Sequence, residues 1–253
     1  MPPAIVFASG KGGVGKSTMA LNVAVALADQ GVRPGLVDAD VHGPDIPAML
    51  GITRRAEARS VTLWQAGRAP DEPVEHLGVK VMSPQFLVAE DQSLDWSSPL
   101  VQLLLRRIVV DVNWGDIDVL FVDVPPGTAD VQQDLFGLLP EARVVVVVTP
   151  QYAAHLDARK LVTMLKAREI PILGGVENMT GLDCPNCGHH VALFEKVAEE
   201  YTIWAEGVER LAEIPFLTAS SAASSTTPVV RSAPDSPTAK AIGALATALR
   251  ASL

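Results

Sequence analysis

The sequence has few of the features that mark secreted, membrane-spanning or nucleic-acid-binding proteins. It holds only two cysteines in 253 residues, which excludes a disulfide scaffold and makes a reducing, cytoplasmic compartment the expected location. Its most apolar run, Val144 to Val148, is far too short to cross a bilayer. The formal net charge of −9 argues against a nucleic-acid partner, because such binding needs a basic surface.

The N-terminal residues show no recognisable targeting segment. The opening stretch, MPPAIVFASGKGG, lacks a basic leader region and runs directly into a strand-like pattern. Hydrophobic residues make up 48% and charged residues 19% of the chain, a composition typical of globular proteins. The length is enough for one α/β domain with a full core. We therefore expect a single domain over residues 1–253.

Strand-like and helix-like stretches alternate along the chain. The expected strands are Ala4–Ala8, Pro34–Val37, Val79–Ser83, Asp118–Asp123, Arg143–Thr149 and Pro171–Glu177. The expected helices are Ser17–Asp29, Pro99–Val112, Ala153–Arg168 and Pro237–Ala251. Residues 52–78 and Ser220–Pro237 are expected to be irregular. The alternation predicts an α/β fold, a mostly parallel twisted sheet with helices on both faces.

The strongest motif is GKGGVGKS, from Gly10 to Ser17. It matches G-x-x-x-x-G-K-[ST], the phosphate-binding loop (P-loop), and stands between an expected strand and an expected helix. Its glycines allow backbone N–H groups to converge on phosphate, and the helix N-terminus adds positive charge. We expect Lys16 to neutralise the β- and γ-phosphates of a nucleotide and Ser17 to bind Mg²⁺.

A second lysine, Lys11, stands at the start of this loop. A side chain there cannot easily fold back onto its own phosphates, but it can reach a nucleotide on a facing subunit. The position of Lys11 therefore predicts a dimer.

Acidic residues follow two of the expected strands. Asp38 and Asp40 come just after Pro34–Val37, at the edge where ligand chemistry gathers in open α/β sheets. We expect Asp40 to orient the attacking water and Asp38 to hold the loop or a Mg²⁺-bound water. Asp123 ends an apolar strand and is expected to hold Mg²⁺ through water. Gly127, in the turn after it, is expected to bring a backbone N–H close to the γ-phosphate.

The two cysteines form the knuckle Cys184-Pro185-Asn186-Cys187-Gly188. This spacing lets two thiolates bind one metal, but two ligands are only half of a tetrahedral or cluster site. His189 and His190 follow too closely to complete it. The same pair from a second chain would give four sulfurs, which suit either Zn²⁺ or a 4Fe–4S cluster.

Taken together, these motifs resemble the Mrp/Nbp35 group of iron–sulfur cluster carrier ATPases, within the MinD/ParA/nitrogenase-iron-protein class of P-loop NTPases. The matching segments are SGKGGVGKST (9–18), DADVHGPDIPAMLG (38–51), DVPPGTADVQ (123–132), TPQYAAHLDARK (149–160), VENMTGLDCPNCG (176–188) and EIPF (213–216). They follow the family's order over nearly the whole chain.

The resemblance implies a function and a set of site residues. It implies a slow ATPase that holds a 4Fe–4S cluster between two chains through Cys184 and Cys187. Recipient iron–sulfur apoproteins and a scaffold donor are the implied partners, besides the second chain. It implies roles in hydrolysis for Lys11, Lys16, Asp40 and Asp123, with Mg²⁺ on Ser17, Asp40 and Asp123. The implied ATP contacts are Gly10, Lys11, Gly12, Gly13, Val14, Gly15, Lys16, Ser17, Thr18, Gly127, Asn178, which reads adenine, and Pro215.

The chain also departs from the family pattern. The departures are at His42, Ser97, Ser98, Phe194–Leu211 and Ser220–Thr227, and they concern partner contacts and cluster delivery more than ATP. An alternative function is a MinD/ParA-like partition ATPase, and a third is a plain metabolic ATPase or kinase. The alanine-rich segment Thr238–Leu253 has only two cations and is expected to pack rather than dock on a membrane.

Overall fold

The structure, a computed structural model, describes residues 2–41, 43–52, 71–87, 98–127, 130–184, 186–216 and 226–253. The strands are β1 Ala4–Ala8, β2 Pro34–Asp38, β3 Val74–His76, β4 Val79–Met82, β5 Val119–Asp123, β6 Arg143–Val148, β7 Ile172–Asn178, β8 Leu182–Asp183, β9 His190–Val191 and β10 Arg210–Ile214. The α-helices are α1 Lys16–Asp29, α2 Ile46–Met49, α3 Ser98–Val109, α4 Asp130–Leu138, α5 Tyr152–Ala167, α6 Val229–Ser232 and α7 Pro237–Arg250. Short 3-10 turns cover Pro84–Phe86, Glu199–Tyr201 and Trp204–Glu206.

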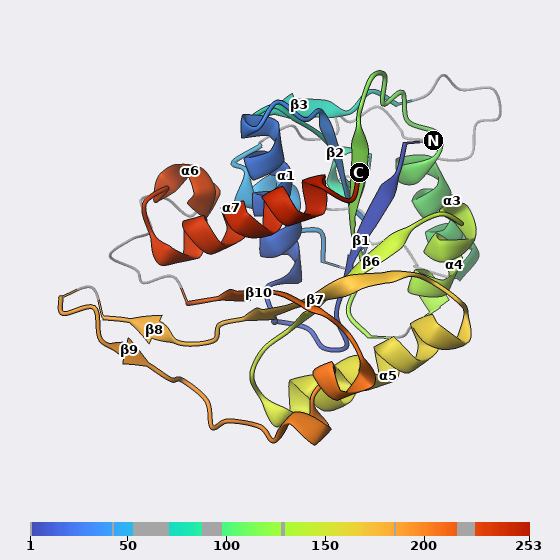
Figure 1. Cartoon of the computed structure of the whole chain (residues 1–253). Coiled ribbons are helices and arrows are strands. Elements are labelled where there is room, and N and C mark those ends of the chain that lie inside the picture. The colour runs from blue at the N-terminus through green and yellow to red at the C-terminus, as the bar shows by residue number, and fades with distance from the viewer. Residues whose placement is uncertain are drawn as a thin grey trace.

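An eight-stranded sheet in the order β10-β7-β6-β1-β5-β2-β4-β3 forms the centre of the fold (Figure 1). Neighbouring strands run parallel except for the edge pair β3–β4, which is antiparallel. Strands β8 and β9 form a separate antiparallel hairpin. The predicted α/β class, a mostly parallel sheet with helices, is confirmed.

Both faces of the sheet are buried, as expected when helices cover a parallel sheet on both sides. Along β6, Val144, Val146 and Val148 pack in one core with α3, α4 and α5. Val145 and Val147 point the other way, into a second core with α1 and α7. This explains why β6 is a continuous valine run rather than an alternating pattern. No helix in the described ranges is long and apolar enough to cross a membrane.

The structure corrects parts of the sequence prediction. The stretch 52–78 is not wholly irregular, because Val74–His76 forms the edge strand β3 (residues 53–70 lie outside the described part). Within Ser220–Pro237, helix α6 forms, while 220–225 lie outside the described part. The helix α4 and the strand β10 were not predicted. The helix predicted to reach Val112 ends at Val109, and Val112 instead makes a parallel bridge with Asp71.

The carboxyl ends of the central strands meet at one edge of the sheet. β2 and β5 are in register so that Asp38 lies opposite Asp123, and β1 pairs with β5 so that Phe7 lies opposite Asp123. The chain after β1 therefore passes beside Asp123, and Asp38 lies one strand further along the sheet. The departures at His42 and Ser97 lie outside the described residues.

Candidate nucleotide site and cysteine hairpin

The loop between β1 and α1 has the backbone that its glycines allow. Gly13 and Gly15 have φ angles of 78° and 87°, a left-handed region that favours glycine, and Gly15 is the N-cap of α1. Gly10 lies against α5, and a Cβ there would be 2.2 Å from the carbonyl carbon of Asp157. The loop therefore rests on the backbone of α5, and its N–H-rich turn leads into a helix N-terminus, the arrangement that binds phosphate.

Lys16 and Asp123 form a buried ion pair at the base of the loop. Lys16 Nζ lies 2.5 Å from Asp123 Oδ1, with 6% and 1% of the side chains exposed. Burial raises the pKa of Asp123, while Lys16 and the Ser17 hydroxyl oppose that rise. The second oxygen, Oδ2, is buried without a hydrogen-bond partner in the described part of the chain. A buried carboxylate oxygen without a partner beside a serine hydroxyl fits a water-bound Mg²⁺ ion.

Asp38 and Asp40 have different environments. Asp38 is fully buried and accepts hydrogen bonds from Ile46 N (3.2 Å) and Ser83 Oγ (3.3 Å), so it holds the start of the α2 segment. Burial, followed by the charge of Asp123, raises the pKa of Asp38 well above its usual range. Asp40 is half-buried and, among the described residues, its side chain accepts only from Gly43 N, at 3.3 Å. Of the two, Asp40 is therefore the carboxylate placed to meet a ligand.

Lys11 lies within the loop, and Gly127 lies beside Ser9 at its start. The Lys11 side chain is exposed and makes no hydrogen bond or ion pair with any described residue. Gly127 has a φ of 97°, but its N–H donates to Ser9 O at 2.8 Å. In this structure the Gly127 N–H is therefore occupied, and its predicted contact with a γ-phosphate requires that bond to be exchanged.

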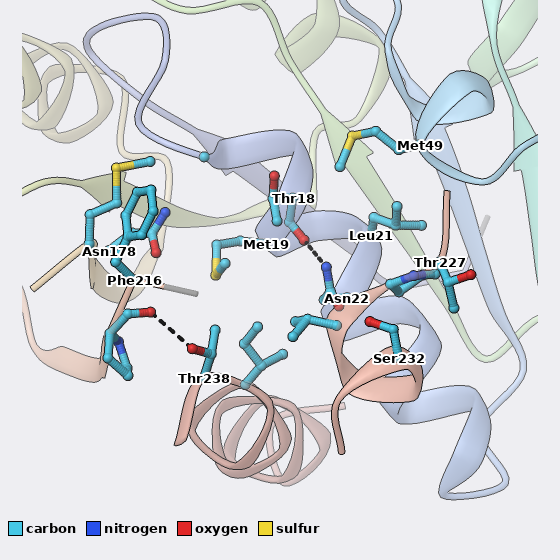
Figure 2. Close-up of a pocket in the computed structure, with 16 residues that line it drawn as sticks. Thr18, Met19, Leu21, Asn22, Met49, Asn178, Phe216, Thr227, Ser232 and Thr238 are labelled. Atoms are coloured by element: carbon cyan, nitrogen blue, oxygen red, sulfur yellow. Dashed lines mark hydrogen bonds between the residues drawn. The ribbon is translucent and has the colours of Figure 1, made fainter. Parts of the chain in front are cut away.

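A pocket of about 250 Å³ opens beside the first turn of α1 (Figure 2). Predicted site residues Gly15, Thr18, Asn178 and Pro215 line it. The other lining residues are Met19, Leu21, Asn22, Met49, Met179, Phe216, Thr227, Pro228, Val229, Ser232, Thr238 and Ile242. A mostly apolar pocket with a few amides and hydroxyls suits a nucleotide base.

Asn178 joins this pocket to the phosphate loop. It ends β7, is 6% exposed, and its Nδ2 donates to Val14 O at 2.8 Å. A Cβ on Gly15 would lie 2.2 Å from that nitrogen, so the asparagine packs directly on the loop. Its Oδ1 accepts no hydrogen bond from the described residues and is available to a base amino group.

Cys184 and Cys187 lie at the tip of the β8–β9 hairpin, which extends beyond the end of β7 (Figure 1). The tip is closed by bonds from Cys184 N to His189 O (2.9 Å) and from Gly188 N to Cys184 O (2.8 Å). The N–H groups of Cys187 and Asn186 point at the Cys184 thiol and lower its pKa. A lowered pKa favours the thiolate, which is the form that binds metals.

The hairpin offers an incomplete metal site. No group of three or more His, Cys, Asp or Glu residues gathers in the described ranges. His189 contributes its carbonyl to the turn, and the ring of His190 lies close to Gly181, where a Cβ would come within 2.3 Å. Among the described residues, the two cysteines are thus the candidate metal ligands at the hairpin tip.

Some contacts of the site could not be found from the motifs. Ser9 accepts from Gly127, Ser83 donates to Asp38, and Met179 and Phe216 line the pocket. Ser83 belongs to no motif, and although Phe216 lies in the EIPF segment, only the folded chain places either residue here.

The loop, its buried lysine–aspartate pair and the sheet order define the class: this is a P-loop NTPase. A family model described as the NUBPL iron-transfer P-loop NTPase of the ParA group matches residues 2–250. An iron-sulfur cluster carrier protein of Pseudomonas fragi is 44% identical over 219 residues, covering 84% of this chain and 72% of that protein. The chain belongs to the NUBPL family of iron-transfer P-loop NTPases.

Solved structures agree with this placement. A nucleotide-binding protein of Archaeoglobus fulgidus in complex with ADP has a TM-score of 0.68 and 34% identity, covering 85% of this chain and 82% of that one. The cell division ATPase MinD of Pyrococcus furiosus has a TM-score of 0.71 and 25% identity over 100% of both chains. The Archaeoglobus fulgidus protein is the more similar of the two in sequence, and the Pyrococcus furiosus protein has the same fold at lower identity.

Proposed function

We propose that this protein is an ATP-hydrolysing carrier that holds one 4Fe–4S cluster between two copies of the chain and passes it to iron–sulfur apoproteins. The observation that carries the proposal is the hairpin after β7, which presents two cysteines and, within the described ranges, no group of three or more potential metal ligands. The names of its relatives support the cargo, since the similar protein of Pseudomonas fragi is an iron-sulfur cluster carrier.

The nucleotide half of this function rests on residues around the loop. The N–H groups of the loop and Lys16 bind the phosphates, and Asn178 and Pro215 contact the base. Mg²⁺, when bound, neutralises phosphate charge during hydrolysis, and Ser17 and Asp123 hold it. Asp40, half-buried at the carboxyl edge, orients the attacking water. Lys11, exposed and without a partner in the described chain, reaches the nucleotide of the second copy.

The cluster half requires the second copy. A 4Fe–4S cluster needs four ligands, usually cysteine thiolates. One chain supplies Cys184 and Cys187 and contains no other cysteine. A two-fold axis between two hairpins brings the same pair together twice and completes the set. Binding of a cluster by these cysteines therefore requires the dimer.

Reconstitution with iron and sulfide under anaerobic conditions tests this function. Cys184→Ala and Cys187→Ala should each lose the iron–sulfur absorption while they retain ATP binding, because the hairpin tip lies outside the nucleotide pocket. The matched control is His189→Ala, which changes a neighbouring potential ligand but removes no cysteine. Full iron and sulfide in both cysteine variants would refute the bridging site.

The MinD/ParA-like alternative has no comparable support. A partition ATPase that cycles on a membrane uses an exposed amphipathic segment. Here α7 packs on the sheet, with Ile242, Leu245 and Leu249 buried in the core that it shares with α1. The likeness to MinD is one of fold, and it leaves the cysteine hairpin without a role.

A further inference from the structure

The pocket beside α1 and the root of the cysteine hairpin meet where the chain leaves β7 and β10. β7 and β10 are parallel neighbours, with Asn178 opposite Ile214. Beyond the sheet, the two stretches that follow these strands remain paired. Thr180 N donates to Ile214 O (3.1 Å), and Phe216 N donates to Gly181 O (2.7 Å). The stretch that follows β7 then enters β8 and the tip that carries the cysteines. The first arm of the hairpin is therefore the continuation of β7, and the end of β10 is hydrogen-bonded to its root.

The same two stretches supply one end of the base pocket. Asn178 and Met179 line it from the β7 side, and Pro215 and Phe216 line it from the β10 side (Figure 2). Met179 has a φ of 62°, an uncommon conformation for a non-glycine residue, at the point where the chain turns from the sheet into the hairpin. Its side chain reaches Gly15, where a Cβ would be 3.8 Å from the methionine methyl group.

Phe216 stands at the junction. Its backbone N–H is bonded to Gly181 in the hairpin root, while its side chain lines the pocket and is 45% exposed. An aromatic side chain at a pocket wall stacks on a purine ring, and ordering it against the ring also orders its backbone. A base in the pocket thus contacts a residue that is directly hydrogen-bonded to the arm that carries the cysteines.

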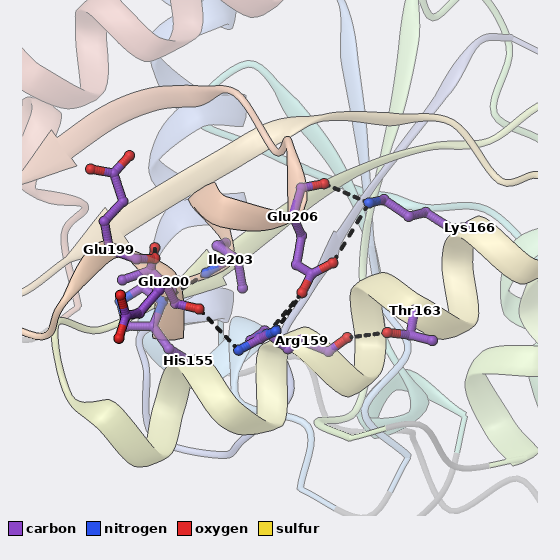
Figure 3. A network of polar contacts seen from close by, with 9 residues as sticks. His155, Arg159, Thr163, Lys166, Glu199, Glu200, Ile203 and Glu206 are labelled. Carbon is purple, nitrogen blue, oxygen red and sulfur yellow. Dashed lines mark hydrogen bonds and ion pairs between the residues drawn. The ribbon is translucent and has the colours of Figure 1, made fainter.

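The chain that follows the second arm, β9, is anchored separately, on α5, through Ile203 and Glu206. His155 Nδ1 accepts from Ile203 N at 3.4 Å, and Arg159 pairs with Glu206 at 2.7 Å (Figure 3). Lys166 Nζ also donates to the Glu206 carbonyl. Because the chain after the second arm is fixed on a helix that packs on the sheet, a shift of the first arm at Gly181, which is bonded to Phe216, changes the orientation of the tip.

We propose that Phe216 is a positioning residue that couples the nucleotide base to the cysteine hairpin, so that purine occupancy of the pocket sets the orientation of Cys184 and Cys187. This inference rests on the proposed function and adds the route by which nucleotide governs the cluster ligands. The route runs through the base rather than through the γ-phosphate. ADP should therefore act on the hairpin of a single chain as ATP does.

The two cysteines provide a direct readout without any cluster, because they are the only thiols in the chain. Reduced, cluster-free protein is treated with N-ethylmaleimide, and the modification rate of Cys184 and Cys187 is followed by mass. Saturating Mg–ADP should change this rate about fivefold or more, the usual size of a coupling between two sites. Magnesium tripolyphosphate, bound to saturation as judged by displacement of ADP, fills the phosphate loop but not the base pocket and should leave the rate unchanged.

Three variants assign the effect to Phe216. Phe216→Ala, measured at an ADP concentration raised until binding saturates, should lose the change in rate, and Phe216→Tyr, which keeps the ring, should retain it. Leu253→Ala is the matched control, because it removes a large apolar side chain of similar exposure (40%) that follows α7 and does not line the base pocket. It should behave as the unaltered protein does.

The results that overturn the coupling are equally specific. They are an unchanged ADP effect in Phe216→Ala, an equal effect of tripolyphosphate, or no effect of saturating ADP on the unaltered protein. The tripolyphosphate comparison needs no variant and so decides even if Phe216→Ala folds poorly. Iron and sulfide uptake, measured separately, tests the carrier function, so failure of one proposal does not imply failure of the other.

Discussion

Lys16 and Asp123 are 107 positions apart in the sequence, yet Nζ of one lies 2.5 Å from Oδ1 of the other in the interior of the protein. The pair joins the first residue of α1 to the last residue of β5. Because the pair is buried, removing either partner leaves an uncompensated ion in the interior, which destabilises the protein. The phosphate site and the proposed Mg²⁺ site therefore share one buried ion pair, which the protein's own residues form.

The first prediction concerns the lysine of this pair. Lys16→Ala should weaken Mg–ATP binding by roughly 100-fold or more, because it removes the cation on the β- and γ-phosphates and leaves Asp123 unpaired. Lys240→Ala is the control, since that lysine is an exposed residue of α7 that does not line the pocket. Titration with a fluorescent ATP analogue measures both. Unchanged affinity in Lys16→Ala would remove the basis for the nucleotide site.

The second prediction is that Lys11 acts on the partner's nucleotide. Lys11→Ala and Asp40→Ala should each abolish hydrolysis alone, and an equal mixture should recover it. In a mixed dimer, the site on the Lys11→Ala chain has its own Asp40 and receives Lys11 from the other chain. Random pairing should therefore restore about a quarter of the normal rate. A mixture that stays inactive although mixed dimers form would show that Lys11 acts within its own chain.

The third prediction follows from the raised pKa of Asp38. In the unfolded chain Asp38 ionises at its ordinary pKa, whereas burial and the charge of Asp123 keep it protonated to higher pH in the folded protein. The folded state then binds more protons, so the Asp38 contribution to the free energy of unfolding falls as pH rises through this window. The fall is up to about 1.4 kcal/mol per pH unit for one proton.

Asp38→Asn removes this titration. Urea unfolding is measured at a series of pH values, starting near the ordinary pKa of an aspartate at about 4. As pH rises, the free energy of unfolding of Asp38→Asn should increase relative to that of the unaltered protein. The absolute stability at one pH also reflects the bonds from Ile46 and Ser83, so the slope is the relevant quantity. Parallel curves for the two proteins would contradict the raised pKa.

The fourth prediction compares two glycines with nearly equal backbone angles. Gly15 has a φ of 87° and Gly31 a φ of 82°, so alanine is strained at both. At Gly31 a Cβ would meet nothing within 4 Å, and Gly31→Ala should cost about 1 kcal/mol. At Gly15 it would lie 2.2 Å from Asn178 Nδ2, so Gly15→Ala should cost roughly 2–4 kcal/mol, because the bond to Val14 is lost as well. Denaturant unfolding measures both, and equal losses would mean that the Asn178 contact contributes nothing.

The central part of the fold could be predicted because buried parallel strands have a distinctive sequence. β1 was predicted with its observed bounds, Ala4–Ala8, and β6 to within one residue, because both are runs of apolar residues between two helix layers. The edge strands β3 and β10, which were not predicted, have no such run, whereas β4 was predicted as Val79–Ser83 and is observed at Val79–Met82. β3 and β4 are joined at Leu77 and Gly78, both with positive φ, and leucine gives no turn signal at such a position. β10, RLAEI, is an edge strand with charges at two of its five positions.

The site could be predicted only where a motif specifies it. The P-loop residues, Asp123 and the cysteine pair each carry a pattern of residue type and spacing. The partner of Asp38 is Ser83, and no local pattern connects residues 45 positions apart. Phe216 belongs to the EIPF segment, but its bond to Gly181 depends on the pairing of two distant stretches of the same chain beyond the sheet. These relationships arise from tertiary structure.

The most direct test of the account is the metal content of the native dimer. Protein reconstituted anaerobically and purified by size exclusion should contain about four irons and four sulfides for every two chains. Mass measured under non-denaturing conditions should show those atoms on a dimer and none on a monomer. One colourless metal per dimer without sulfide would indicate a zinc site, and a full cluster on a monomer would contradict the bridging of two hairpins by Cys184 and Cys187.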